Sequence, residues 1–227
     1  MNPTHRTGPA TPRLDPLTHS DLVVHARRLA HQLLVTERHE RWQHTQGVAG
    51  QAVRIAGTVG DADRPLLVAA AWLHDIGYSP PLKQTGFHPL DGALYLAGQG
   101  WNHRLVALIA HHSGARYIPV RRGLTPLMRR FPFEDSAVAD ALTYADQTVG
   151  PHGLHMTMPD RIAEAIARHG PHSPDAQLLI DRIPHLRAVA ARVEKRLDAL
   201  LPIPDDTLDG ADRPRLACGR SSSGRSR

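Results

Sequence analysis

Apolar residues recur at helical spacing along most of this chain. In the segment 20–34, "SDLVVHARRLAHQLL", one helical face collects Leu22, Val23, Ala26, Leu29, Ala30 and Leu33. Only 4% of the residues are aromatic, so a core must be built from Ala, Leu, Val and Ile, which suits closely spaced helices. No segment alternates apolar and polar residues as a half-buried strand would. The sequence therefore predicts an all-α fold, a bundle of about seven to eight helices.

The same periodicity places the other helices. They are expected over residues 41–59, 64–76, 89–100, 102–112, 134–149, 160–170 and 175–201. Gly77 and the pair Pro80–Pro81 are predicted to end the helix that begins at residue 64. The segment 113–133 is basic and has no period, so we expect an irregular loop there.

One domain is predicted over residues 18–203. Residues 1–17 are rich in Pro and Thr and are expected to be a disordered arm, and residues 204–227 a disordered, arginine-rich tail. The formal net charge is +5, but residues 213–227 alone hold five arginines and no acid. The rest of the chain balances 22 basic against 22 acidic residues, so no specific nucleic-acid partner is expected.

The cysteine content and the hydropathy of the sequence indicate in which cellular compartment the protein is expected. The single cysteine, Cys218, lies in the polar tail, so neither a disulfide framework nor a cysteine-based metal site is expected. The N-terminal residues lack the apolar segment of a signal peptide, and no apolar run approaches the roughly 18 to 20 residues that cross a bilayer. These features predict a soluble, cytoplasmic protein, and they leave open whether it forms a homodimer.

Histidine and aspartate side chains interrupt several apolar segments. His74 and Asp75 follow directly on the apolar run that ends at Leu73. Burial of an unpaired carboxylate costs several kcal/mol, so a packed helix carries such a pair only where something satisfies it. Comparable positions are His44, His88, His111, His112 and Asp146. Each alone is more often a hydrogen-bonded core residue or a cap; together, nitrogen and carboxylate ligands without thiolate suit Fe, Mn, Co, Zn or Mg.

The order of these residues resembles the HD-domain metal-dependent phosphohydrolase superfamily. The pattern of that family is a histidine, a His–Asp doublet and a distant aspartate, which match His44, His74–Asp75 and Asp146. The neighbouring sequences "RWQHTQGVA", "AAWLHDIG" and "TYADQT" are similar too, and the resemblance covers about residues 38–150. It implies an HD-domain helical bundle.

A subset of the superfamily adds two histidines between the doublet and the last aspartate, and these go with a dinuclear site. His88 matches the first of them. Either His111 or His112 could be the second, and the "HHSGAR" context favours His111. The resemblance then implies that His44, His74, Asp75 and Asp146 hold one divalent metal, and that Asp75 bridges to a second ion held by His88 and His111.

The resemblance also implies an activity. A metal-activated hydroxide would hydrolyse a phosphoester or phosphoanhydride of a small metabolite, most plausibly a nucleotide, with His74 and Asp75 at the reacting centre. Arg116 and then Arg41 are the first candidates to contact the substrate phosphate, followed more weakly by Arg121 and Arg122.

One position departs from the pattern. Many catalytic relatives read His-Asp-x-x-Lys, and Tyr78 stands here in place of the lysine, with Lys83 the nearest substitute. The mode of substrate binding therefore cannot be copied from those relatives. An alternative hypothesis is a metal-binding HD-fold module that regulates or binds a ligand without turnover. His152 and His155 follow Asp146 in a polar loop and are expected to face solvent.

Overall fold

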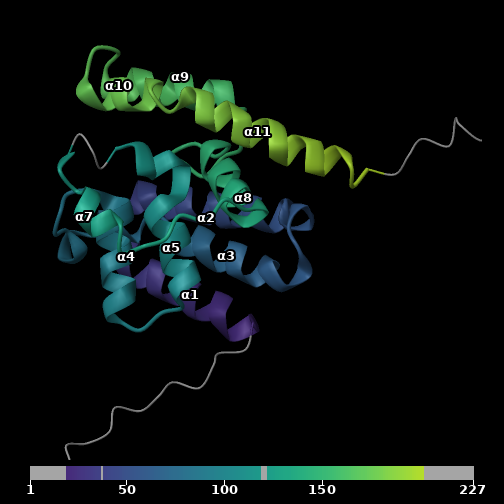
Figure 1. Ribbon diagram of the computed structural model, residues 1–227, viewed down its shortest axis with the longest axis horizontal. Coiled ribbons are helices and arrows are strands. Elements are labelled where there is room, and N and C mark those ends of the chain that lie inside the picture. Colours follow the sequence, from purple (N-terminus) through teal and green to yellow (C-terminus); the bar gives the residue numbers. More distant parts are fainter. Residues whose placement is uncertain (1–18, 37, 119–121, 202–227) are drawn as a thin grey trace, which may run out of the picture.

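The computed structural model describes residues 19–36, 38–118 and 122–201. The predicted arm at 1–17 and the predicted tail at 204–227 lie outside these residues. The described residues are helical, apart from turns and one isolated bridge between Val149 and His155 (Figure 1). The all-α prediction is confirmed.

Ten α-helices lie in the described part of the chain. They are α1 (His19–Leu34), α2 (His39–Arg54), α3 (Arg64–Leu73), α4 (His88–Gly98), α5 (His103–His111), α7 (Thr125–Met128), α8 (Ala137–Gln147), α9 (Met158–His169), α10 (Pro174–Ile180) and α11 (Ile183–Asp198). Short 3-10 turns cover Ile76–Tyr78, Pro80–Leu82 and His112–Tyr117 among other segments.

Two differences account for the larger number of helices. The segment 113–133, expected to be irregular throughout, contains the single-turn helix α7. The segment 175–201, expected to be one long helix, is divided into α10 and α11 around Asp181 and Arg182. Pro184 lies in the first turn of α11, where its missing N–H costs nothing, whereas inside a continuous helix it would remove a hydrogen bond.

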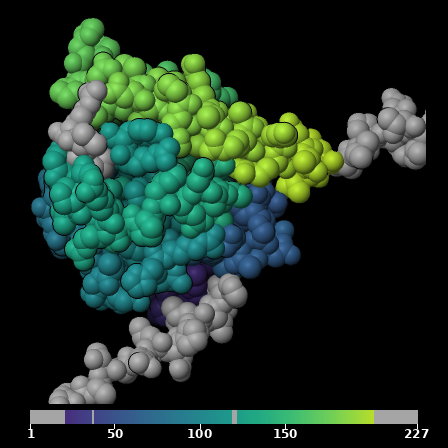
Figure 2. All heavy atoms as spheres, in the orientation of Figure 1, coloured from purple at the N-terminus to yellow at the C-terminus, as the bar shows by residue number. Residues whose placement is uncertain are grey.

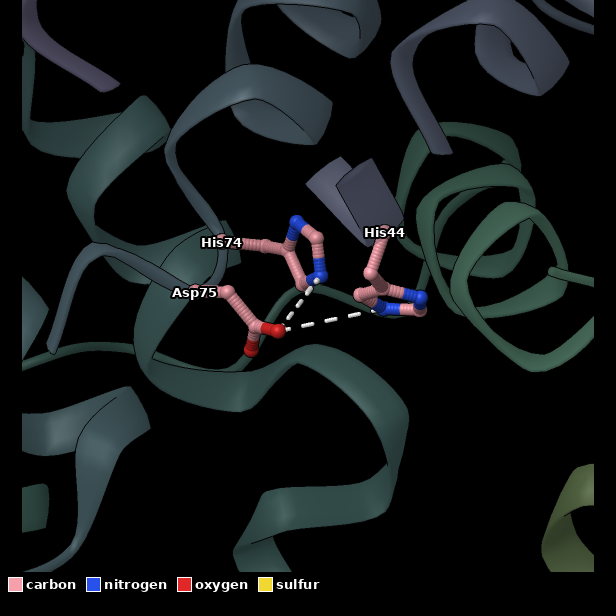
Figure 3. Close-up of side chains that lie close together, drawn as sticks. All are labelled: His44, His74 and Asp75. Carbon is pink, nitrogen blue, oxygen red and sulfur yellow. Dashed lines mark ion pairs between the residues drawn. The ribbon is translucent and has the colours of Figure 1, made fainter. Parts of the chain in front are cut away.

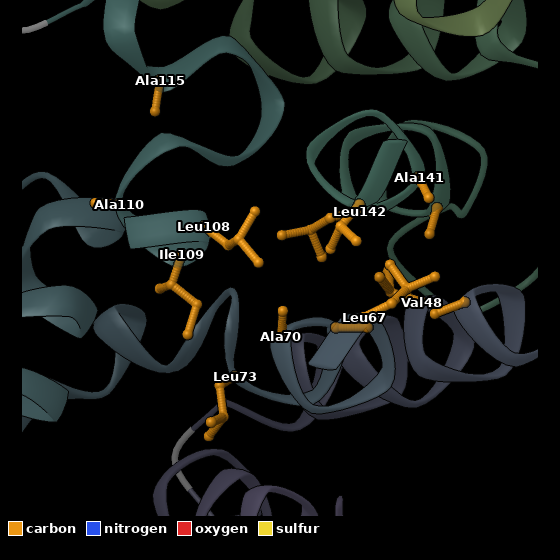
Figure 4. Packing of buried hydrophobic residues seen from close by; sticks show 14 of the residues in the cluster. Val48, Leu67, Ala70, Leu73, Leu108, Ile109, Ala110, Ala115, Ala141 and Leu142 are labelled. Atoms are coloured by element: carbon orange, nitrogen blue, oxygen red, sulfur yellow. The ribbon is translucent and has the colours of Figure 1, made fainter. Parts of the chain in front are cut away.

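Helix α3 lies at the centre of the core and packs against α1, α2, α5 and α8. Its fully buried residues Leu67, Ala70 and Leu73 belong to the same apolar core as Val48 of α2 and Leu142 of α8, and Leu67 lies beside Val48 (Figure 4). Ala69, Ala70 and Ala71 are all fully buried, and their small side chains let neighbouring helices approach closely. This packing carries the C-terminal end of α3, and the residues that follow it, into the interior.

Helices α9, α10 and α11 form a separate layer over the body of the molecule, and we call them the roof helices (Figures 1 and 2). Helix α11 is joined to α8 through Asp140, which accepts hydrogen bonds from Arg192 Nε at 2.8 Å and from Arg196 Nη2 at 2.7 Å. Val189 and Val193 of α11 are buried against the same core. Among the described residues, no helix is both long and apolar enough to span a membrane.

Candidate metal centre

Three helices, α2, α3 and α8, deliver the central residues of the site. His74 caps the C-terminal end of α3 and Asp75 follows it, while His44 projects from α2 (Figure 3). Asp146 lies in the last turn of α8. His44 Nε2 lies 2.9 Å from Asp146 Oδ1, and His74 Nε2 lies 3.7 Å from the same oxygen. Residues that are far apart in the sequence therefore meet at one buried point, as the sequence predicts.

The two carboxylate oxygens of Asp75 face different groups. Oδ2 lies 3.4 Å from His74 Nε2 and 3.8 Å from His44 Nε2. Oδ1 lies 3.2 Å from His88 Nε2 and 3.9 Å from His112 Nε2. Asp75 thus belongs to two clusters with the spacing of metal ligands, His44–His74–Asp75 and Asp75–His88–His112.

The preference of the sequence pattern for His111 over His112 is wrong. The His111 Nε2 hydrogen-bonds the carbonyl oxygen of Phe131 at 2.8 Å, away from the cluster. Helix α5 ends at His111, and Ser113 adopts a left-handed conformation with φ 52°, so the chain reverses and His112 faces inward. Its Nε2 lies 3.3 Å from His88 Nε2.

Hydrogen bonds to backbone carbonyls fix the orientation of three of the rings. The Nδ1 atoms of His44, His74 and His112 lie 3.0, 2.8 and 2.6 Å from the carbonyl oxygens of Gly150, Ala71 and Ile109. Because carbonyls only accept, each Nδ1 carries a proton, and each Nε2 is the ring atom that faces the cluster.

One of these Nε2 atoms has no hydrogen-bond partner among the described residues. His74 Nε2 is buried and makes no hydrogen bond of acceptable geometry. A buried polar atom without a partner costs about 1 to 3 kcal/mol, and this one lies beside the other Nε2 atoms and two carboxylates. A divalent cation would satisfy all of them at once, so the donor set fits a metal of the nitrogen- and oxygen-binding class.

Electrostatics favour a cation at the same point. Burial alone would raise the pKa of Asp75, but His74 and Arg41 outweigh it and hold that pKa well below its usual value. Burial would lower the pKa of His74, yet the carboxylates of Asp75 and Asp146 raise it to about 9. Burial, together with the neighbouring His74 and His88, lowers the pKa of His112 to about 3, so that ring is neutral.

Two residues that the sequence patterns did not single out position Asp146. The Ser113 hydroxyl donates to Asp146 Oδ2, and the Gln147 amide donates to the same oxygen at 2.9 Å. Such partners fix the direction of a carboxylate before it meets an ion. Ser113 carries one detectable signal, since it follows the doublet His111–His112; Gln147 carries none beyond its place beside Asp146.

The cluster lies at one wall of a cavity of about 370 Å³. Four cationic residues reach the cavity from the body, and three from the roof helices and the turn between them. These are Arg38, Arg41, Lys83 and Arg122 from the body, and Arg161, Arg168 and Arg182 from the roof. The cavity therefore suits an anionic ligand.

Arg41, Tyr78 and His88 form a stack beside Asp75. The Tyr78 ring lies over the His88 ring with 4.0 Å between centroids, and the Arg41 guanidinium lies 4.4 Å from the centroid of Tyr78. Arg41 Nη1 also donates to Asp75 Oδ2 at 3.0 Å. Arg41 is thus held at the cavity wall, with Tyr78 against it.

The structure does not bring Arg116 to this cavity, and that prediction is corrected. Its guanidinium lies 4.1 Å from the centroid of Phe133 and donates to the Tyr117 hydroxyl, beside a separate cavity of about 120 Å³. Cation–π contacts hold it there. Arg122 does line the main cavity, whereas Arg121 lies outside the described residues. His152 and His155 are exposed, as predicted.

Comparison with known families agrees with this geometry. The family model of the HD domain matches residues 41–148, a range that contains every residue of the two clusters. Searches of curated proteins and of solved structures found no significant match. Over residues 41–148 this chain is an HD domain.

Proposed function

We propose that this protein is a metal-dependent phosphohydrolase that acts on a phosphoester or phosphoanhydride of a small metabolite, most plausibly a nucleotide. One observation carries the proposal: Asp75 directs one oxygen to each of two histidine groups at the wall of a cationic cavity. A cavity of about 370 Å³ is in the size range of small-molecule sites.

In this proposal, His44, His74, Asp75 and Asp146 hold one divalent ion. Asp75, His88 and His112 hold a second, with Fe, Mn, Co, Zn or Mg as the candidates. Bound divalent ions supply Lewis-acid stabilisation of the phosphoryl group and make water a better nucleophile at neutral pH.

Arg41 is the residue of this chain that we propose contacts the substrate phosphate. Asp75 and Tyr78 hold its guanidinium in place from two directions, so little side-chain entropy is lost when an anion binds. A fixed guanidinium donates two parallel hydrogen bonds to phosphate oxygens. In this way Arg41 supplies the positive charge that Tyr78 lacks.

Hydrolysis of p-nitrophenyl phosphate and bis-p-nitrophenyl phosphate with added Mn²⁺ tests the proposal. The wild type is expected to release p-nitrophenol, and His74→Ala and Asp75→Ala are expected to abolish release. His152→Ala, at an exposed position, is the matched control and should keep the wild-type rate. A panel of nucleotides then identifies the preferred substrate. A wild type that is inert with every metal would refute the proposal.

The alternative function is a metal-binding HD-fold module without turnover. Tyr78 is the observation in its favour, because a neutral ring stands where many catalytic relatives have a charged lysine. Stoichiometric metal together with an inert wild type in the assay above would support the module. The cytoplasmic location and a homodimer remain predictions from the sequence.

A further inference from the structure

The roof of the cavity carries an arginine that hydrogen-bonds backbone carbonyls. Arg182 lies in the turn between α10 and α11, outside the residues that match the HD family model. Its Nη1 donates to the carbonyl oxygen of Ser113 at 2.8 Å and its Nε to that of Leu178 at 3.2 Å. Within the described residues, no carboxylate lies at ion-pair distance from it. Burial lowers the pKa of Arg182, which reflects the cost of keeping this charge away from water.

A second roof arginine lies beside it. Arg161 of α9 is only 6% exposed, and its Nε donates to the carbonyl oxygen of Val149 at 2.9 Å. Its Nη1 pairs with Glu164, and the same carboxylate also pairs with Arg168. One glutamate is thus shared by two guanidinium groups, while Arg182 has none. The roof side of the cavity therefore carries an excess of positive charge.

The position of Arg182 relates this excess to the candidate metal centre. The carbonyl oxygen of Ser113 accepts from Arg182, and the hydroxyl of the same residue donates to Asp146. Ser113 therefore links Arg182 to Asp146 through hydrogen bonds. Arg41, by contrast, donates a hydrogen bond to Asp75 directly. The two arginines are thus held beside the cluster through different carboxylates, Arg41 by Asp75 directly and Arg182 by way of Ser113 and Asp146.

Charge balance points the same way. In the proposed centre, two divalent ions, the two aspartates and Arg41 leave a net positive charge that one phosphate dianion only partly neutralises. Arg161 and Arg182 are surplus to that balance. A guanidinium that is held by hydrogen bonds and faces a cavity is a preorganised site for the oxygens of a phosphate.

We infer that Arg182, together with Arg161, forms a second anion subsite that binds a further phosphate of the substrate. This inference rests on the proposed function and narrows it: the substrate carries at least two phosphate groups, of which one lies at the metal centre and another under the roof helices.

Calorimetric titration of the full-length protein with methylenediphosphonate, which is not hydrolysed, and with methylphosphonate tests the subsite. We expect the wild type to bind the diphosphonate about tenfold more tightly than the monophosphonate. In Arg182→Gln the two affinities should become equal. Arg187→Gln, at an exposed position of the same helix α11 that does not line the cavity, is the control and should behave as wild type.

A second variant keeps the test informative if Arg182→Gln does not fold. Arg182→Lys keeps the charge but cannot reach the Ser113 carbonyl and a phosphate together, so we expect about a threefold loss of the preference for the diphosphonate. Thermal unfolding of each variant shows whether it is folded. A full preference in Arg182→Gln or Arg182→Lys, or no preference in the wild type, would overturn the inference.

The p-nitrophenyl phosphate assay of the wild type distinguishes failure of the subsite from failure of the proposed function. If the wild type releases p-nitrophenol but its diphosphonate affinity does not depend on Arg182, the subsite is wrong and the proposed function stands. If the wild type is inert with every metal, the proposed function fails, and with it the assignment of the subsite to a substrate.

Discussion

His88 Nε2 and His112 Nε2 lie 3.3 Å apart, and Asp75 Oδ1 lies 3.2 Å from the first of them. The Nδ1 proton of His112 is donated to the carbonyl oxygen of Ile109, so its Nε2 presents a lone pair to His88. Two imidazoles in this arrangement need a proton or a cation between them. The relationship makes His112, and not its neighbour His111, the residue that completes the second cluster.

Substitution of the two adjacent histidines should have opposite results. We expect His112→Ala to lose one bound metal ion and to lower kcat/KM by about 100-fold or more, because a ligand is removed. His111→Ala should keep the metal content, because that ring hydrogen-bonds Phe131 instead. Elemental analysis of the two purified variants decides between them. Loss of metal in His111→Ala alone would show that the assignment is reversed.

The Tyr78 ring should matter more than its hydroxyl. The ring lies between His88 and Arg41. Tyr78→Phe keeps both stacking contacts, so kcat/KM should stay within about twofold of wild type. Tyr78→Ala frees both neighbours and should raise KM by about tenfold, because Arg41 loses a contact that fixes it. Steady-state kinetics with p-nitrophenyl phosphate measures both; equal effects of Phe and Ala would assign the role to the hydroxyl.

Gly77 should tolerate no side chain. A Cβ at this position would clash with the carbonyl oxygen of His88 and lie 2.7 Å from the amide nitrogen of Gly92. Because these are backbone atoms of α4, they cannot give way without moving His88. We expect Gly77→Ala to lower the free energy of unfolding by about 3 kcal/mol, measured by urea denaturation.

Gly98 of the same helix α4 is the matched control for Gly77. A Cβ there would meet nothing within 4 Å, so Gly98→Ala should change the free energy of unfolding by no more than about 1 kcal/mol. An equal effect of the two substitutions would show that close approach to α4 is not the reason for glycine at position 77.

The attachment of α11 to α8 should weaken in acid. Burial alone would raise the pKa of Asp140, but hydrogen bonds from Arg192 and Arg196 outweigh it and hold that pKa below its usual value. A lowered pKa in the folded state means that this stabilisation is present above the unfolded-state pKa of about 3.9 and is lost as pH falls through the folded-state value.

Asp140→Asn isolates that contribution. We expect it to lower the free energy of unfolding by about 2 kcal/mol at pH 7, and to lower it by less as pH falls below about 4. Urea denaturation of wild type and variant at a series of pH values from neutral into the acid range measures the difference. A difference that does not change with pH would assign the effect to packing and not to charge.

The sequence predicts the residues whose position depends on local helix structure. The helical period places His74 and Asp75 at the end of α3, and the neighbouring sequences identify His44 and Asp146 as their partners. The choice between His111 and His112 depends instead on the left-handed turn at Ser113 and on a carbonyl acceptor at Phe131, which lies twenty residues away. Helical periodicity carries no information on either.

The sequence also does not predict that the roof arginines line the cavity. Arg161 and Arg182 reach the cavity only because the roof helices lie over the body, and that placement depends on contacts such as those of Asp140 with Arg192. The division of the last predicted helix is a different case, because Pro184 is a visible local signal for a helix start.

The number of metal ions bound per chain tests the central claim most directly. Elemental analysis of purified wild type and of Asp75→Ala, at known protein concentration, measures it. Because Asp75 directs one oxygen to each histidine group, we predict two divalent ions in the wild type and none at stoichiometric level in Asp75→Ala. A wild type without stoichiometric metal, or an Asp75→Ala variant with the wild-type metal content, would contradict the account.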